Sequence, residues 1–347
     1  MPARNDGKAG GSGASAGSGG HGVTPRARFR AGAAEAGERL DRCLAAWLPE
    51  LSRAYLQELV AAGAVLVDGE RRPASYRLTE GAEVEVEQRP RDELRGRSPV
   101  APPALVVLYE DEDVVVLDKP AGHAMHAGGS VFSGTIAEAA EARWGPGLPQ
   151  RAPGEPGIVH RLDQDTSGVV VLARTEAALA GLMRQFEART VEKEYTALVA
   201  GRPRFASDWI EKPLERDPRR KDRMRVARKD GREAATYWEL VEDFDGFALL
   251  RCRPRTGRTH QIRVHLAAVD LPIVGDEVYR PRSAQGRGLP ADAPAPGRFF
   301  LHAAALAFDH PRDGRRLRFE APLPPDLARL LDWLRAHRGR GGGKHGG

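Results

Sequence analysis

Apolar residues recur every three or four positions in two consecutive segments near the start of the chain, which predicts two short helices. Ser52 stands where the second helix would begin, and Gly63 stands where it would end. A short apolar run then leads to an Asp-Gly pair typical of hairpin turns and to an alternating strand. Residues 38–88 therefore predict a compact α+β domain. The pattern is carried by Leu40, Leu44, Trp47, Leu48, Tyr55, Leu56, Leu59, Val60, Asp68, Gly69, Val84 and Val86.

From residue 104 onward, short apolar runs and alternating stretches outnumber the helical patterns. Helices are expected at residues 176–188 and 259–269 and around residues 327–334. Helices do not alternate regularly with the strands, which argues against a repeated βαβ arrangement. Residues 104–337 are therefore predicted to form an α+β domain with a mixed, mainly antiparallel sheet. The expected strands cover residues 105–108, 114–118, 168–173, 193–199, 234–241, 247–253, 301–308 and 317–319.

Three segments show no periodic pattern. Residues 1–35 are rich in glycine and serine and carry arginines near their end, and residues 338–347 have a similar composition. Such segments bury too little apolar surface to offset the entropy of ordering, so both are predicted to be disordered basic tails. Residues 89–103 are charged and proline-rich, which indicates a linker between the two domains.

Cysteine usage and hydropathy bear on the compartment. The two cysteines, Cys43 and Cys252, lie far apart in apolar patterns, and neither has a neighbour at metal-ligand spacing. The start of the chain lacks the apolar core of a signal peptide, and no apolar run approaches the length of a membrane span. We expect a cytoplasmic protein that does not act at a membrane.

The charge balance suggests a polyanionic partner. Lysine and arginine number 53 against 48 acidic residues, and most of the cations are arginines that occur in clusters. Arginine suits bidentate phosphate contacts and stacking on bases. A GC-rich genome would also favour arginine over lysine, so composition alone leaves both explanations open.

Two carboxylates, Asp163 and Asp165, lie in a polar cluster directly before the apolar strand at residues 168–173. Turns attached to a rigid sheet are frequent positions for catalytic groups. From these residues alone, either aspartate could be a catalyst or could stabilise the turn. An acid/base pair for glycoside hydrolysis is disfavoured, because carboxylates two residues apart rarely reach a facing separation of roughly 5–9 Å.

A second polar cluster, RPRTGRTHQIRVH, covers residues 253–265 and contains four arginines. Taken alone, the cluster favours a solvated basic face over a functional site. His260 and His265 are five positions apart, which directs them away from each other on a helix, so no metal site is predicted. Tyr195, on an alternating strand, could be a half-buried core residue. The sequence has no P-loop, GxGxxG or GxSxG motif, which argues against nucleotide-dependent enzymes and serine hydrolases.

Together these clusters resemble the RluA family of pseudouridine synthases, of the ribosomal large-subunit type and nearest its D-type members. Five motifs occur in the family's order: DKPAG at residues 118–122, HRLDQDTSG at 160–168, EKEY at 192–195, TGRTHQIRVH at 256–265 and LPIVGDEVY at 271–279. The resemblance covers residues 104–335, and its departures from the usual pattern are Asp118, Gln164 and Leu271. Residues 38–88 resemble the S4 RNA-binding domain through RLDRCL, SRAYLQELVAAGAVLVDG and EGAEVEV.

The resemblance implies an RNA pseudouridine synthase in which Asp163 is the catalytic carboxylate. It assigns Arg263 as the basic partner, and an arginine within a few ångströms would keep a buried carboxylate charged. Tyr195 would offer its ring to the extruded uracil. The implied reaction needs no cofactor and no metal. The residues expected to contact substrate or RNA are His160, Arg161, Arg258, His260 and Gln261, with Arg39 and Arg53 of the S4-like domain.

The expected substrate is structured RNA, most of all large-subunit ribosomal RNA or its precursor, modified by a monomeric enzyme. The same chemistry on tRNA is an alternative. A second alternative is a non-catalytic S4-type RNA-binding protein. The presence of Asp163, Tyr195 and Arg263 argues against that second alternative, because a decayed site would be expected to lose such residues first.

Overall fold

The computed structural model describes residues 26–89, 100–128, 131, 133–220, 223–280 and 288–337. The chain divides into two compact units, one up to Pro99 and one from Val100 onward, and each has its own hydrophobic core. Residues 1–25 of the predicted N-terminal tail, the predicted C-terminal tail at residues 338–347 and most of the predicted linker lie outside the described residues. No helix among the described residues is long and apolar enough to cross a membrane.

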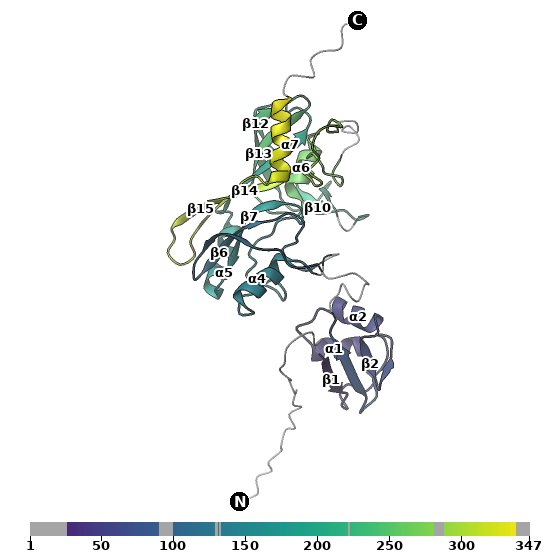
Figure 1. Cartoon of the computed structure of the whole chain (residues 1–347). Helices are drawn as coiled ribbons and strands as arrows, with labels where there is room; N and C mark the ends of the chain where they lie inside the picture. The colour runs from purple at the N-terminus through teal and green to yellow at the C-terminus, as the bar shows by residue number, and fades with distance from the viewer. Residues whose placement is uncertain are drawn as a thin grey trace, which may run out of the picture. The chain divides into compact units, whose positions relative to one another are not determined.

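The first unit packs two helices against a four-stranded antiparallel sheet with the order β1-β4-β2-β3 (Figure 1). Ser52 begins the second helix as expected, since its hydroxyl accepts the backbone N–H of Tyr55 at 3.3 Å. Leucines from both helices and valines from the strands fill the core. The elements are β1 (Arg26–Arg30), α1 (Leu40–Trp47), α2 (Arg53–Ala61), β2 (Val65–Val67), β3 (Glu70–Arg71) and β4 (Glu83–Glu87).

Residues 26–30 differ from the sequence-based prediction, which assigned them to a disordered tail. They form β1, which pairs with β4 from Arg26 opposite Glu87 to Arg30 opposite Glu83. Its alternating arginines lie opposite the glutamates of EVEVE in β4, and Phe29 stacks on Trp47 with ring centres 5.0 Å apart. The basic composition of this stretch obscured its alternation, because the complementary acidic strand lies more than fifty residues further along.

The second unit is built on a nine-stranded sheet with the order β5-β6-β7-β14-β8-β13-β12-β9, where β15 also pairs with β14. All of its strand pairs are antiparallel except β7 with β14, so the predicted mixed, mainly antiparallel sheet is confirmed. The elements are β5 (Val106–Glu110), β6 (Val114–Lys119), α4 (Ile136–Trp144), β7 (Ser167–Ala173), α5 (Glu176–Ala188), β8 (Glu192–Ala200), β9 (Ser207–Glu211), β10 (Leu214–Arg216), β11 (Met224–Val226), β12 (Ala235–Asp243), β13 (Phe247–Pro254), α6 (Gln261–Ala268), β14 (Leu301–Asp309), β15 (Arg316–Glu320) and α7 (Pro325–Ala336).

Helices cover both faces of the sheet around β7, which explains why this strand is apolar at nearly every position. Val169 and Val171 pack with residues of α5, whereas Val170 and Leu172 pack with residues of α4 on the other face. Helix α4 was not predicted from the sequence. Its buried face consists mainly of alanines, which give a weak periodic signal.

The register of the central strands places residues that are far apart in the sequence side by side in the sheet. Ser167, the first residue of β7, lies opposite His302 of β14, and the next residue of β14, Ala303, lies opposite Tyr195 of β8. The close approach of β7 to β14 requires glycine at position 168, because a Cβ there would lie 2.1 Å from the carbonyl oxygen of Ala303. Tyr195 also lies opposite Cys252, two residues before β13 ends. The turn before β7 and the chain leaving β13 therefore meet beside Tyr195.

Candidate active site

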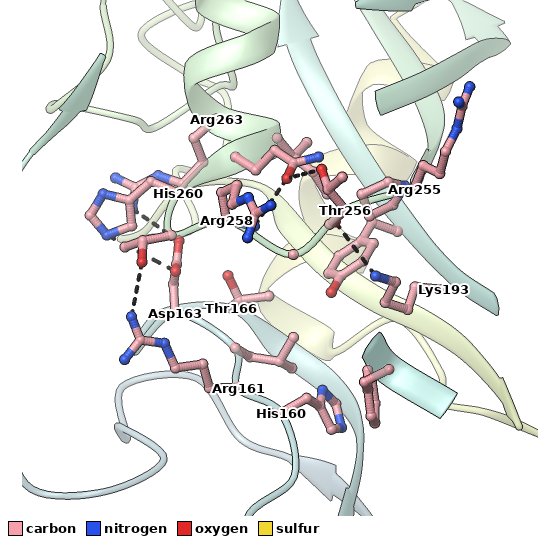
Figure 2. A pocket seen from close by; sticks show the side chains of 18 of the residues that line it. His160, Arg161, Asp163, Thr166, Lys193, Arg255, Thr256, Arg258, His260 and Arg263 are labelled. Atoms are coloured by element: carbon pink, nitrogen blue, oxygen red, sulfur yellow. Dashed lines mark hydrogen bonds and ion pairs between the residues drawn. The ribbon is translucent and has the colours of Figure 1, made fainter. Parts of the chain in front are cut away.

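A cavity of about 540 Å³ opens where the turn before β7, the middle of β8 and the start of α6 meet. Asp163, Tyr195 and Arg263 all line it, although Asp163 and Arg263 are 100 residues apart in the sequence. Figure 2 shows Asp163 and Arg263 on the same side of this cavity. The structure thus brings together the three residues to which the sequence assigned the chemistry.

Arg263 connects two aspartates. Its Nη1 donates to Oδ2 of Asp163 at 3.2 Å, while Nε and Nη2 donate to the two carboxylate oxygens of Asp276 at 2.7 and 3.1 Å. The Asp276 side chain is 1% exposed, the Arg263 side chain 6% and the Asp163 side chain 21%. Of the three charged groups, the carboxylate of Asp163 is therefore the one that a substrate can reach.

Two rings and two carboxylates fix the Arg263 guanidinium in place. Its central carbon lies 4.1 Å from the ring centre of Phe299 and 5.0 Å from that of Tyr279. Burial alone would lower the pKa of Arg263, but Asp276 and then Asp163 outweigh burial and raise the pKa above its ordinary value. Arg263 is consequently a permanent, oriented cation whose remaining donor faces Asp163.

His260 lies beside the same carboxylate but further away. Its Nε2 is 4.0 Å from Oδ1 of Asp163, and its Nδ1 is 2.7 Å from the hydroxyl oxygen of Tyr279. Burial lowers the pKa of His260 below its ordinary value, so the ring is neutral at physiological pH. The residue has left-handed backbone angles and forms the N-cap of α6, which explains why this helix begins at Gln261 and not at the predicted residue 259.

Tyr195 contributes an aromatic wall from the middle of β8. Burial, and then the nearby charge of Asp163, raise the pKa of its phenol, so the hydroxyl stays protonated. The ring also packs against buried apolar residues. An apolar ring held next to a carboxylate suits a flat base that must lie close to that carboxylate.

Gln261 also lines the cavity, but its side-chain amide is hydrogen-bonded inside the protein, and its expected contact with RNA stays a prediction. Its side-chain oxygen accepts from the hydroxyl of Thr256 at 2.7 Å and from the backbone N–H of Arg258 at 3.0 Å. Its nitrogen donates at 3.0 Å to both the carbonyl of Ala235 and the hydroxyl of Thr236. With all its polar capacity used internally, Gln261 holds the loop between β13 and α6 in shape.

His160 lines the cavity as a neutral ring. Its Nε2 accepts the backbone N–H of Val171 at 3.1 Å, and the ring stacks on Phe186 with centres 4.7 Å apart. Burial, with a smaller contribution from the charge of Lys193, lowers the pKa of His160 to about 3. The residue therefore cannot act as a cation toward phosphate.

Arg161 and Arg258 are cations at the cavity wall (Figure 2). Arg161 donates to the hydroxyl of Thr259 at 2.9 Å, and Arg258 donates to the carbonyl of Glu233 at 3.0 Å. Within the part of the chain that the structure describes, neither forms an ion pair with a carboxylate. Both therefore line the cavity without a carboxylate partner among the described residues, and their contact with RNA stays a prediction.

Sequence reasoning assigned no role to Asp276 or Lys119, although both lie in motifs that it quoted. Lys119 is fully buried and donates to the carbonyls of Pro120 and Gln164 at 2.8 and 3.0 Å. Burial lowers the pKa of Lys119 to about 7. Its ammonium ties the segment after β6 to the residue that follows Asp163, which restrains the loop carrying the exposed carboxylate.

In the first unit, the two arginines expected to meet RNA have different surroundings. Arg39 donates twice to the carboxylate of Asp41, at 2.9 Å each. Arg53 is exposed at the start of α2 and forms no ion pair among the described residues. The cation of Arg53 is the more accessible of the two to a phosphate.

The site thus consists of a buried arginine that aligns an accessible aspartate beside an aromatic wall, on a mixed, mainly antiparallel sheet. The model of the RNA pseudouridylate synthase family matches residues 113–268, and the S4 domain model matches residues 38–84. Together with relatives that are similar over most of its length, these matches show that the chain belongs to the RNA pseudouridylate synthase family. It is an RNA-modifying isomerase with an S4 RNA-binding domain.

The relatives are similar along nearly the whole chain. The ribosomal large subunit pseudouridine synthase D of Xanthomonas campestris is 42% identical, and the match covers 88% of this chain and 91% of the relative. An uncharacterized RNA pseudouridine synthase of Bacillus subtilis is 37% identical over 86% of this chain and 94% of its own. Among solved structures, human RNA pseudouridylate synthase domain containing 1 has a TM-score of 0.51 at 25% identity, covering 69% of this chain and 98% of that one.

Proposed function

We propose that this enzyme converts uridine to pseudouridine in large-subunit ribosomal RNA and that Asp163 is its catalytic carboxylate. The 3.2 Å contact from Arg263 to Asp163 in the cavity wall is the observation that carries this assignment. It orients a carboxylate at the wall of the space that an extruded base would enter.

The chemistry places few demands on the protein beyond this carboxylate. The bond between C1′ and N1 of uridine breaks, the uracil turns, and a bond from C5 to C1′ forms. C5 loses a proton and N1 gains one, so the product is an isomer of the substrate and no electrons are exchanged with a second reactant. Whether Asp163 attacks the nucleoside or removes a ribose proton, it must be ionised, and the fixed cation of Arg263 supports that state.

Two observations support ribosomal RNA as the substrate. Several relatives of comparable length are named for the ribosomal large subunit, among them those of Xanthomonas campestris and Neisseria meningitidis. The S4 domain and the arginines at the cavity wall provide contacts to phosphate, which position a large structured RNA without reading much of its sequence. We also propose that the enzyme works in the cytoplasm.

The substrate can be tested directly. Transcripts of large-subunit ribosomal RNA and of tRNA, each carrying tritium at uracil C5, are incubated with the protein without cofactor, and label released to water is counted. We expect release from the ribosomal transcript and little from tRNA. Release from tRNA alone would contradict the ribosomal assignment, and release from neither would contradict the catalytic one. Pseudouridine maps of total RNA with and without the gene then identify the position.

Tyr195 is expected to act through its ring and not through its hydroxyl. Tyr195→Phe should keep kcat within about threefold of the original enzyme, because the aromatic wall is unchanged. Tyr195→Ala removes the face against which the uracil packs and should lower kcat by about 10²-fold or more, the scale expected when a reacting group is misplaced by about 1 Å. Single-turnover tritium release measures both variants. A Phe variant as inactive as the Ala variant would mean that the hydroxyl takes part in the reaction.

The S4 domain is expected to supply affinity and not catalysis. Deleting residues 1–99 leaves the second unit, which has its own core and all three proposed active-site residues. The shortened protein should still isomerise uridine at high RNA concentration. Its affinity should fall and the salt dependence of binding should become shallower, because fewer phosphates are neutralised. Binding isotherms at several salt concentrations check this, and an unchanged affinity and slope would contradict it.

A matched pair of point variants in the full chain refines the same test. Arg53→Ala removes an accessible cation and should weaken RNA binding. Arg26→Ala removes an arginine whose charge is already paired with Glu87 at 3.1 Å, and should change binding less. Equal losses in the two variants would show that the ion pairs do not select which arginines bind phosphate.

A further inference from the structure

A pair of aromatic rings, one exposed and one half-buried, lies on the last two strands of the large sheet, and neither ring lines the catalytic cavity. Trp209 of β9 stands directly opposite Tyr237 of β12, and their ring centres are 5.4 Å apart at an angle of 51°. Trp209 is 43% exposed, whereas its neighbour Ile210, which points to the other face, is 2% exposed. The two rings therefore belong to the solvent face of the sheet and contribute little to its core.

A single arginine connects these rings to the cavity. The guanidinium carbon of Arg255 lies 4.4 Å from the ring centre of Trp209, and Arg255 is also one of the residues that line the cavity. Its backbone N–H donates to the carbonyl of Ala235 at 2.9 Å, which fixes its position directly after β13. Figure 2 shows Arg255 across the cavity from Asp163, with its side chain extending outward. We call Trp209, Tyr237 and Arg255 the aromatic platform.

The charge of Arg255 is available to a ligand. Its ion pair is with Glu211 at 3.5 Å, and the two side chains are 47% and 64% exposed. Such a long, solvated pair contributes little and is easily exchanged for a stronger phosphate contact. An exposed indole supported by a second ring, beside an available arginine, matches the composition with which proteins bind unpaired nucleotides.

Base extrusion would bring RNA to the rim of the cavity, where Arg255 lies. A uridine turned into the cavity leaves its flanking nucleotides at the rim, and their bases lose a stacking neighbour. Cross-strand packing alone would account for the contact between Trp209 and Tyr237. It does not account for an arginine of the cavity wall stacked on the exposed indole.

We propose that the aromatic platform binds an unpaired nucleotide that flanks the target uridine. The base stacks on the surface formed by the Trp209 ring and the Arg255 guanidinium, and the adjoining phosphate pairs with Arg255. Tyr237 supports the indole from the neighbouring strand. This inference rests on RNA as the substrate and adds a site, outside the catalytic cavity, that selects RNA with an unpaired base next to the uridine.

The test combines protein and RNA changes in a double-mutant cycle. Trp209→Thr removes the ring but keeps a residue that favours strands, and Trp209→Phe keeps an aromatic face. With a short RNA hairpin as substrate, Trp209→Thr should raise KM about five- to a hundredfold, the range of one base–aromatic stack, and leave kcat within about twofold. Trp209→Phe should stay close to the original enzyme. Val106→Ala, an exposed residue of β5 at the opposite end of the sheet, is the control and should change neither constant.

The RNA partner is identified with hairpins that carry an abasic nucleotide at each position flanking the uridine in turn. At one position the abasic change should raise the KM of the original enzyme. The same change should not raise the KM of Trp209→Thr any further, because that variant has already lost the stacking contact. Purely additive effects at every position, or an unchanged KM in Trp209→Thr, would overturn the proposal. Tritium release by the original enzyme is measured in the same series, so a failure of the proposed function appears as no release at all. Thermal melting of each variant separates a loss of folding from a loss of binding.

Discussion

Asp163→Asn is expected to abolish uridine isomerisation while the fold and RNA affinity stay nearly unchanged. An amide can neither attack the nucleoside nor accept a proton, yet its oxygen can still accept from Arg263. Stability should change little, because the Asp163 side chain is 21% exposed and Arg263 keeps its two hydrogen bonds to Asp276. Tritium release, RNA binding and thermal melting measured on one preparation check all three expectations.

The control for this variant comes from the same loop. Asp165→Asn removes an equal charge two residues away, and Asp165 is not among the described residues that line the cavity. This variant should keep most of its activity. Measurable turnover in Asp163→Asn would refute the assignment of the catalytic carboxylate. Equal losses in both variants would indicate that the charge of the loop matters and not the position of one carboxylate.

Arg263→Lys is expected to lower kcat far more than it changes KM for RNA. The guanidinium uses Nε and Nη2 for Asp276 and Nη1 for Asp163, and a lysine ammonium cannot reproduce that planar arrangement. The variant should also lose about 1–3 kcal/mol of stability, because Asp276 is buried and would keep incomplete hydrogen bonding. Steady-state kinetics and chemical denaturation measure the two effects separately.

An exposed arginine of the preceding strand is the matched control. Arg251→Lys changes a side chain that is 41% exposed and pairs with Glu194 at 3.1 Å and with Glu239 at 2.6 Å. It should alter kcat and stability by little, since surface ion pairs typically contribute about 0–1 kcal/mol. If Arg263→Lys behaved like this control, Arg263 would be part of a basic face and not the group that orients Asp163.

The sequence predicted the parts of the site that depend on local motifs. Asp163 and Arg263 each stand in a motif with a characteristic order of residues, and the two motifs together led to their pairing. Asp276 was missed because its effect is indirect: it holds Arg263 from a buried position and does not face the cavity. The structural role of Gln261 was also missed. A glutamine among arginines suggests an RNA contact, and only the folded loop reveals that its amide is fully used inside the protein.

In the fold, too, elements with a clear pattern of their own were predicted, and elements that depend on distant partners were not. Most strands of the large sheet were predicted because their own apolar pattern marks them. Strand β1 was not predicted, since its arginines gain partners only when the glutamates of β4 lie opposite. Helix α4 was not predicted because alanine packs closely against the sheet without a strong hydrophobic pattern. In both cases tertiary contacts determine the structure of a segment whose own sequence is ambiguous.

The parallel pairing of β7 with β14 has a consequence for how the enzyme is made. Ser167 must find His302 before the sheet closes beside Tyr195, and contacts between such distant residues form slowly and late. During synthesis, a chain that has not yet reached residue 299 has neither β14 nor Phe299 to support Arg263. Catalytic competence should therefore arise only when the last strands have left the ribosome, so that nascent chains stay inactive even while they are close to ribosomal RNA.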